Sequence, residues 1–121
     1  MDKTGLGSWG EERAAAYLRR HGYHILDRNY RCRLGEIDII ASRRNTVAFV
    51  EVKLRKNSAH GEAREFVTGA KQGRIIRTAQ LWIAEHEGDY QPRFDVIEIY
   101  APKGMETRRP EIHHLEDAFQ L

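Results

Sequence analysis

The chain has 121 residues, a length that suits one hydrophobic core, so we expect a single domain over residues 1–121. Hydrophobic residues make up 40% and charged residues 31%, which excludes the disordered and the membrane-spanning classes. The net charge of +2 balances 20 basic against 18 acidic residues, so charge alone favours an ordinary solvated surface.

The basic residues indicate which kind of ligand the protein can bind, and the single cysteine limits the covalent and metal-binding chemistry of the chain. Arginine accounts for 15 of the 20 basic residues, and its planar guanidinium suits phosphate. Cys32 stands alone, which excludes an internal disulfide and a zinc site built from thiolates. Residues 1–8 lack the basic and then apolar order of a signal peptide. We therefore expect a cytoplasmic protein with no membrane partner.

The first predicted element is a helix from about Trp9 to His21, which Gly22 ends. Ser8-Trp9-Gly10-Glu11 has the form of a capping box at its start. The apolar stripe of this helix comprises Ala14, Ala15 and Leu18. Because Glu11 lies three and four positions before the two alanines, its carboxylate is in line with the buried face.

Three strands and a loop are predicted next. Alternation and β-branched residues indicate strands over about Tyr23–Asn29, Gly35–Ser42 and Thr46–Arg55, with a turn within Arg43–Thr46. Lys56–Val67 has no clear period and several small or polar residues, so we predict a mobile loop there.

The second half is predicted to contain one helix and two strands. Thr68 can cap a helix from about Gly69 to Glu87. Its stripe at helical spacing is Ile75, Ile76, Ala79, Trp82 and Ile83. Pro92–Tyr100 and Ile112–Leu115 read as strands, and Glu116–Phe119 as a short helical tail. The order of helix, strands, helix and strand predicts an α/β fold with a mixed sheet.

The hairpin formed by the second and third predicted strands carries the most informative side chains. If it turns midway through residues 44–45, Asp38 faces Glu51 and Glu36 faces Lys53, all on one face of the sheet. Two carboxylates about 5 Å apart repel by roughly 3 kcal/mol at an effective dielectric constant of 20. That is a large part of the ~5–15 kcal/mol that keeps a domain folded.

The repulsion between Asp38 and Glu51 must be relieved by protonation of one acid, by a neighbouring cation or by a bound metal ion. Two carboxylates and the backbone carbonyl of Val52 form the oxygen set that Mg²⁺ or Mn²⁺ prefers. A metal ion there can activate water and stabilise the charge that develops on a phosphodiester. Lys53 would then orient or deprotonate the attacking water, or neutralise the charged phosphate.

The alternative interpretation is an ordinary amphipathic hairpin with surface ion pairs. It predicts a polar face throughout, whereas the acids share their face with Ile40 and Phe49. The opposite face is wholly apolar and comprises Ile37, Ile39, Val50 and Val52. Because both faces are then at least partly covered, the pattern favours a functional role for the acids over a structural one.

Gly35-Glu36-Ile37-Asp38 followed by Glu51-Val52-Lys53 resembles the PD-(D/E)XK superfamily of restriction-endonuclease-like nucleases, with Ile37 where the superfamily's name places proline. Further blocks make the chain similar to the YraN family of uncharacterised bacterial proteins. These blocks are Gly7, Gly10-Glu11 with Ala14, Arg28-Asn29-Tyr30-Arg31, Lys71-Gln72, Arg93-Phe94-Asp95-Val96 and Asp117-Ala118-Phe119. The resemblance covers nearly the whole chain.

The resemblance implies a restriction-endonuclease-like fold, with a central mixed β-sheet flanked by helices, akin to Holliday-junction resolvases of archaeal type. It also implies binding of nucleic acid, DNA foremost, and endonuclease activity with Mg²⁺ or Mn²⁺. Asp38 and Glu51 match the two motif carboxylates, and Lys53 matches the motif lysine. In those relatives an acid from the first helix completes the metal site, and here it matches Glu11. Gln72 matches a polar residue that some members place near the site.

Basic residues around this hairpin are our candidates for contacts with a nucleic-acid backbone. They are Arg55, Lys56, Arg64, Lys71 and Arg74, together with His60. Contacts of this kind position a substrate without reading its sequence.

Several alternatives stay open at this point. Glu11 can complete a capping box instead of a metal site, and Gln72 can simply decorate its helix. The whole chain can be a nucleic-acid-binding module that does not cut, or an adaptor whose acids form a stabilising network. Resolvase-like relatives act as dimers, so the resemblance also allows a homodimer.

Overall fold

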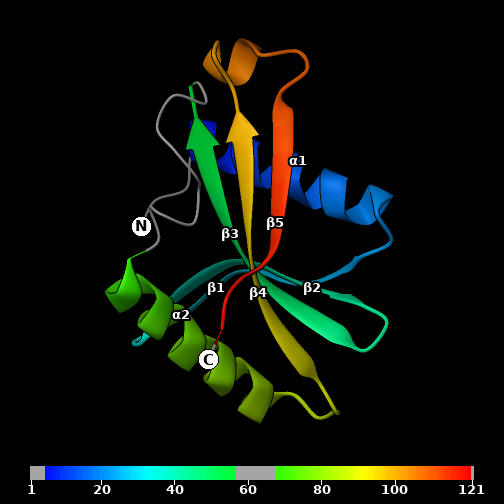
Figure 1. The fold of residues 1–121 in the computed structure, drawn as a ribbon, viewed down its shortest axis with the longest axis vertical. Coiled ribbons are helices and arrows are strands. Elements are labelled where there is room, and N and C mark those ends of the chain that lie inside the picture. Colours follow the sequence, from blue (N-terminus) through cyan, green and yellow to red (C-terminus); the bar gives the residue numbers. More distant parts are fainter. Residues whose placement is uncertain (1–4, 57–67, 121) are drawn as a thin grey trace.

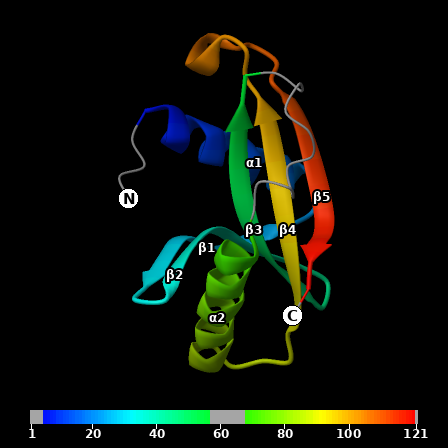
Figure 2. The same ribbon diagram turned by 60° about the vertical axis from the view of Figure 1, so that its left-hand side comes forward.

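The computed structural model describes residues 5–56 and 68–120 and contains one five-stranded sheet between two helices (Figures 1 and 2). In chain order the elements are α1 (Leu6–Arg20), β1 (His24–Cys32), β2 (Gly35–Arg43), β3 (Thr46–Arg55), α2 (Gly69–Glu85), β4 (Gln91–Tyr100), the 3-10 helix η2 (Gly104–Glu106) and β5 (Glu111–Phe119). The strand order is β1-β2-β3-β4-β5, and β3 and β4 are parallel while the other neighbours are antiparallel. The predicted α/β fold with a mixed sheet flanked by helices is confirmed, and it is compatible with a restriction-endonuclease-like fold.

The two helices cover opposite faces of the sheet, and each encloses a hydrophobic core. Strand β3 shows how alternation divides its side chains: Val47 and Phe49 face the core under α2, while Ala48 and Val50 face the core under α1. The α2 side buries the large aromatic rings Trp82, Phe94 and Phe119, and the α1 side buries Ala14, Ala15 and Leu18. Neither helix in the described ranges is both long and apolar enough to span a bilayer.

Helix α1 begins three residues earlier than predicted, and the predicted capping box is wrong. Ser8 lies inside the helix, and the N-cap is Gly5, which makes no side-chain cap hydrogen bond. Gly5 has a φ of 60°, a conformation that suits glycine, and its carbonyl accepts the Trp9 N–H at 3.0 Å. Because the helix begins at Leu6, Ser8 is already inside it and cannot act as its N-cap. Its carboxyl end agrees with the prediction to one residue.

Helix α2 and strand β3 match their predictions closely. Thr68 caps α2 as expected, and its hydroxyl accepts the Lys71 N–H at 3.2 Å. The helix ends at Glu85, two residues before the predicted end. Strand β3 has the predicted bounds, and the turn before it places Arg44 at a φ of 57°.

The predicted helical tail is wrong, because residues 116–119 continue β5 as an edge strand. Asp117 has a φ of 56°, and its N–H donates to the Asp95 carboxylate at 3.0 Å. The register between β4 and β5 shifts at this point, so β5 contains a bulge. The opposite edge strand, β1, has a register shift between Ile25 and Asp27, and its bounds lie later than the predicted Tyr23–Asn29.

Candidate functional site

Strands β2 and β3 pair only at their turn end, in the predicted register. The ladder runs from Arg43 opposite Thr46 to Ile39 opposite Val50. On the side of Ile39 away from the turn, the two strands separate. The β1–β2 hairpin bends away from β3, while β3 continues alongside β4 (Figure 1). We call this opening the β2–β3 fork.

Asp38 and Glu51 are the first residues beyond the last ladder pair. The Val52 N–H, which has left the β2–β3 ladder, donates to the Asp38 carboxylate at 2.8 Å. The two acids of the predicted motif are thus brought together, and a carboxylate takes the place of a backbone acceptor at the point of separation.

Two details of the predicted hairpin are wrong because the strands separate so early. Glu36 does not face Lys53: it pairs with Arg31 of β1, whose Nε lies 2.5 Å from the Glu36 carboxylate. Ile37 does not share the face of Ile39, because it joins the core under α2.

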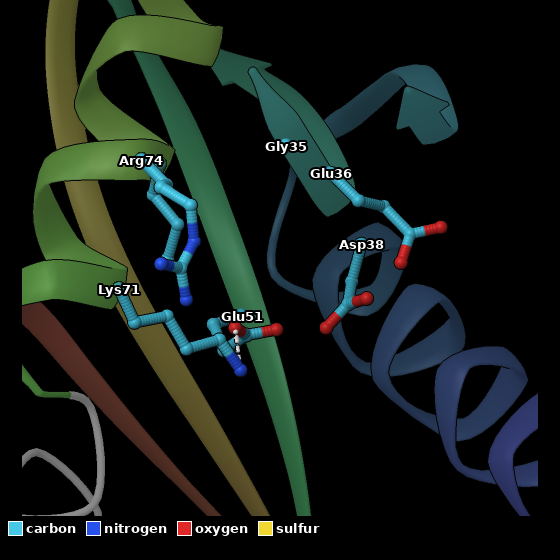
Figure 3. A pocket seen from close by; sticks show the side chains of 7 residues that line it. Gly35, Glu36, Asp38, Glu51, Lys71 and Arg74 are labelled. Atoms are coloured by element: carbon cyan, nitrogen blue, oxygen red, sulfur yellow. Dashed lines mark ion pairs between the residues drawn. The ribbon is translucent and has the colours of Figure 1, made fainter. Parts of the chain in front are cut away.

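The fork contains a pocket of about 160 Å³, covered on one side by the amino-terminal half of α2 (Figure 3). It is lined by Gly35, Glu36, Asp38, Glu51, Lys71, Arg74 and Ile75. Figure 3 shows the Asp38 and Glu51 side chains entering from different strands, with Lys71 reaching Glu51 from the helix. The space is ample for an ion with several waters.

Burial and mutual repulsion make Glu51 an unusual acid. Asp38 is 3% exposed and Glu51 is 9% exposed. Burial, a hydrogen bond with Asp38 and the charge of Asp38 raise the pKa of Glu51 to about 7. The Lys71 ammonium lies 2.8 Å from the Glu51 carboxylate and partly opposes this rise. The pair therefore has the electrostatic strain that the spacing predicted.

The two lysines of the site differ in how readily they lose a proton. Burial and the adjacent charge and hydrogen bond of Lys71 lower the pKa of Lys53. Burial also pulls down the pKa of Lys71, but its hydrogen bond and ion pair with Glu51 outweigh burial and raise it. Lys71 is thus the lysine that keeps its proton beside Glu51, and Lys53 is the lysine better suited to proton transfer.

Glu11 is buried at 2% exposure on the inner side of α1, whose Gly10 packs against Leu54 of β3. No group of three or more His, Cys, Asp or Glu side chains in the described part of the chain is arranged to hold a metal ion. The structure therefore brings two of the three predicted metal ligands, Asp38 and Glu51, into one pocket. It does not add Glu11 to them as a third.

The other predicted residues are placed as follows. Arg74 lines the pocket and is exposed, and Lys56 is exposed at the end of β3. Arg55 is 11% exposed and its Nε lies 2.6 Å from the Glu98 carboxylate. This side chain is therefore held by an ion pair with β4 and exposes little surface to a ligand. Gln72 is half-buried in the first turn of α2 but does not line the pocket. Arg64 and His60 lie outside the described residues.

Lys71 is the member of the site that the sequence interpretation placed elsewhere, among the flanking basic residues. A signal for it exists: Lys71 lies four positions before Ile75, which is buried in the core under α2. Residues four apart share a helix face, so Lys71 extends the buried stripe of α2 towards the sheet. Gln72, at the next position, is the residue that the resemblance favoured instead.

Comparison with known proteins identifies the family. The model of the uncharacterised protein family UPF0102 matches residues 10–99. The chain belongs to this family. A UPF0102 protein of Nocardia farcinica is 48% identical over 119 residues, covering 98% of this chain and 91% of the relative. UPF0102 proteins of Syntrophotalea carbinolica and Caldanaerobacter subterraneus are 47% and 42% identical, covering 98% of this chain and 94% and 98% of those relatives. The predicted membership of the YraN family, which is UPF0102, is confirmed.

The donor set in this UPF0102 chain fits a hard divalent cation. Asp38 and Glu51 offer carboxylate oxygens in a pocket large enough for a hydrated ion. Burial, followed by the hydrogen bond and the charge of Asp38, raises the pKa of Glu51, and a divalent cation would relieve the repulsion between the two acids directly. The Lys71 ammonium lies at one oxygen of the Glu51 carboxylate, so a cation would bind the other oxygen or displace the ammonium.

The raised pKa of Glu51 predicts a stability that falls with pH. The native state keeps a proton on Glu51 up to about pH 7, whereas the unfolded chain releases it near pH 4.5, so unfolding becomes easier as pH rises through this window. We expect the metal-free protein to lose about 3 kcal/mol between pH 4.5 and 8 relative to Glu51→Gln. Urea unfolding of both proteins at the two pH values measures the difference. Equal pH dependence in the two proteins would show that the pKa of Glu51 is not raised in the native state.

Gly35 is predicted to be needed for the close contact between β2 and α2. Its φ is 157°, and a Cβ there would lie 3.0 Å from the Thr78 hydroxyl and 3.6 Å from the Arg74 Cβ. We expect Gly35→Ala to lower the free energy of unfolding by about 1–3 kcal/mol, since β2 must move away from the helix. Gly7→Ala in α1 is the matched control, because a Cβ at that position meets nothing within 4 Å. Thermal or urea unfolding measures both, and equal effects would contradict the prediction.

Proposed function

We propose that this protein is a divalent-metal-dependent nuclease that hydrolyses phosphodiester bonds in nucleic acid, DNA foremost. The observation that carries the proposal is the meeting of Asp38 and Glu51 with Lys53 and Lys71 at the β2–β3 fork. These acids and Lys53 are the residues through which the sequence resembles PD-(D/E)XK nucleases. A mixed sheet flanked by helices is the fold which that resemblance implies.

Asp38 and Glu51 would hold Mg²⁺ or Mn²⁺, with further positions left to water and to a backbone carbonyl such as that of Val52. When bound, the ion supplies an activated water and stabilises negative charge on the phosphate. Lys53, whose pKa is lowered by burial and by Lys71, is the group suited to hold or take the proton of the attacking water. Lys71, released from Glu51, would face the same phosphate as a fixed positive charge.

Exposed basic residues at the pocket and at the end of β3 offer contacts for a nucleic-acid backbone. Arg74 lines the pocket and is exposed, whereas Lys56 is exposed just after the end of β3 and does not line the pocket. Exposed arginine and lysine contact phosphates without reading bases. We leave Arg55 out of this surface because of its ion pair with Glu98.

A second candidate function, a nucleic-acid-binding module that does not cut, is favoured by one observation. The Lys71 ammonium already lies 2.8 Å from the Glu51 carboxylate, and the described residues bring two carboxylates together where the resemblance implies three. A pocket balanced in this way can exist without a metal ion. The two candidates differ in whether added metal displaces Lys71 and starts hydrolysis.

The test uses the full chain with Mg²⁺ or Mn²⁺ and three labelled substrates: branched, duplex and single-stranded DNA. Calorimetry measures metal binding, and denaturing gels measure cleavage. We expect saturable metal binding and cleavage that stops when EDTA is added. A protein that binds these substrates but cuts none of them at any metal concentration supports the second candidate instead.

A further inference from the structure

Four arginines surround a hollow on the α1 side of the sheet, away from the β2–β3 fork. Arg13 and Arg20 come from α1, while Arg108 and Arg109 come from the segment just before β5. Together with three apolar neighbours they enclose a cavity of about 240 Å³. We call this cavity the arginine pocket. It shares no lining residue with the pocket that holds Asp38 and Glu51.

Helical spacing explains why the hollow exists. Arg13, Ala16 and Arg20 follow one another at intervals of three and four residues, so they lie along one flank of α1 beside its buried stripe. Ala16 is short and leaves a gap between the two arginines. Ile112, which packs against the core under α1, and Pro110 close the gap from the β5 side. The pocket thus has an apolar floor and a cationic wall.

In the part of the chain that the structure describes, the positive charge of the pocket has no acidic partner. Within residues 5–56 and 68–120, no acidic side chain forms an ion pair with any of its four arginines. Arg19, Arg28, Arg31, Arg43, Arg55 and Arg93 each have an acidic partner, whereas Arg33, Arg44, Arg74 and Arg77 form no ion pair with a described acidic residue and lie apart from this cavity. An arginine side chain stays protonated at any physiological pH, so four positive charges persist around one cavity.

Two acids near these arginines in sequence have other partners. The Glu12 carboxylate lies 2.8 Å from Arg28 and 3.8 Å from Arg19, and the Glu111 carboxylate lies 3.2 Å from the His113 ring. Arg13 is further positioned by the Trp9 ring, whose centroid lies 5.2 Å from the guanidinium carbon. The lining of the pocket itself contains no acidic residue, so its charge is of one sign.

We propose that the arginine pocket is a binding site for phosphate groups. Guanidinium groups donate two parallel hydrogen bonds to phosphate oxygens, and a phosphate carries the charge needed to balance several of them. The phosphate can belong to a nucleic-acid strand that passes over α1 or to a small polyphosphate. The site is independent of the proposed hydrolysis, because its residues take no part in the acid–lysine pocket.

The test compares two double variants that remove the same charge. Arg108→Gln/Arg109→Gln removes two positive charges that line the pocket, and Arg44→Gln/Arg77→Gln removes two exposed positive charges that line neither pocket. Calorimetry measures the binding of inorganic pyrophosphate. Fluorescence anisotropy at several salt concentrations measures the binding of a fluorescein-labelled DNA strand of about 12 nucleotides, which is about the length of one binding site. All proteins also carry Asp38→Asn and are kept free of divalent metal, so that no cleavage interferes.

We expect the Arg108/Arg109 pair to weaken binding at least about tenfold and the control pair to weaken it less than about threefold. For DNA, the slope of log affinity against log salt should also fall by about 1 to 2 in the Arg108/Arg109 variant. Loss confined to pyrophosphate identifies a small polyphosphate as the ligand, and loss with DNA identifies a nucleic-acid strand. Equal weakening in both variants, or no binding of either probe to the parent protein, would overturn the proposal.

Discussion

Asp38→Asn and Glu51→Gln should each lower metal-dependent cleavage more than about 100-fold without weakening nucleic-acid binding. Replacing residues that only support a metal ligand costs about 10–100-fold, so replacing a ligand itself costs more. Both amides preserve the shape of the side chain, and the amide introduced by Asp38→Asn would keep an oxygen acceptor for the Val52 N–H. Cleavage rates measured at saturating metal, beside anisotropy with the same substrate, separate catalysis from binding.

Stability measurements show whether Asp38→Asn and Glu51→Gln lose cleavage because a metal ligand is missing or because the fold is weakened. Removing one charge of a repelling pair should raise the unfolding free energy of the metal-free protein at pH 8, since Glu51 is forced to ionise there. Glu12→Gln is the matched control, because this exposed acid pairs with Arg28 and Arg19 outside the pocket. A variant that loses both cleavage and stability would mean that the acids form a structural network.

Asp95→Ala should lower the free energy of unfolding by about 3–5 kcal/mol, the largest effect on stability that we expect from one substitution in this chain. Asp95 is 0% exposed, and its carboxylate accepts hydrogen bonds from Arg93, His114 and the Asp117 N–H at 2.7–3.0 Å. Alanine would leave the His114 ring nitrogen and the Asp117 N–H without this acceptor, and the Arg93 guanidinium would keep only the Tyr23 hydroxyl and the Glu116 carboxylate. Urea unfolding at pH 7 measures the loss.

The pH dependence of this effect has a definite sign. Burial alone would raise the pKa of Asp95, but hydrogen bonds from His114, Arg93 and the Asp117 N–H hold it below its usual value. The carboxylate therefore stabilises the fold above the unfolded pKa near 3.9, and this contribution fades as pH falls through the native pKa. Glu12→Ala, in an exposed ion pair, should cost at most about 1 kcal/mol at any pH. A similar small cost for Asp95→Ala would show that the network contributes little.

The sequence predicted those parts of the fold that depend on local pattern. Strand β3 has its predicted bounds because alternation and a clear turn at residues 44–45 determine them, and the same turn sets the register that brings Asp38 next to Glu51. Thr68 was recognisable as a cap because its hydroxyl acts on the next turn of its own helix. These features involve neighbours in the chain.

The features that the sequence did not reveal depend on distant partners. Residues 116–119 form a strand because Asp95, more than 20 positions away, holds the Asp117 N–H, and no local propensity contains that contact. Lys71 enters the acid pocket only because α2 docks against the β2–β3 fork. The separation of the strands at Ile39, which moved Glu36 to Arg31, is likewise a property of the bent sheet.

The bulges in the two outer strands have a consequence for association between molecules. An edge strand exposes backbone groups that can accept a strand from another chain and so start aggregation. Here β1 is interrupted at Leu26 and β5 near Asp117, which are the two free margins of the sheet. Each bulge increases the twist of its edge strand and shortens the regular stretch of backbone with which an incoming strand could pair. The protein thus protects both margins against fibril-like growth by the shape of the strands themselves.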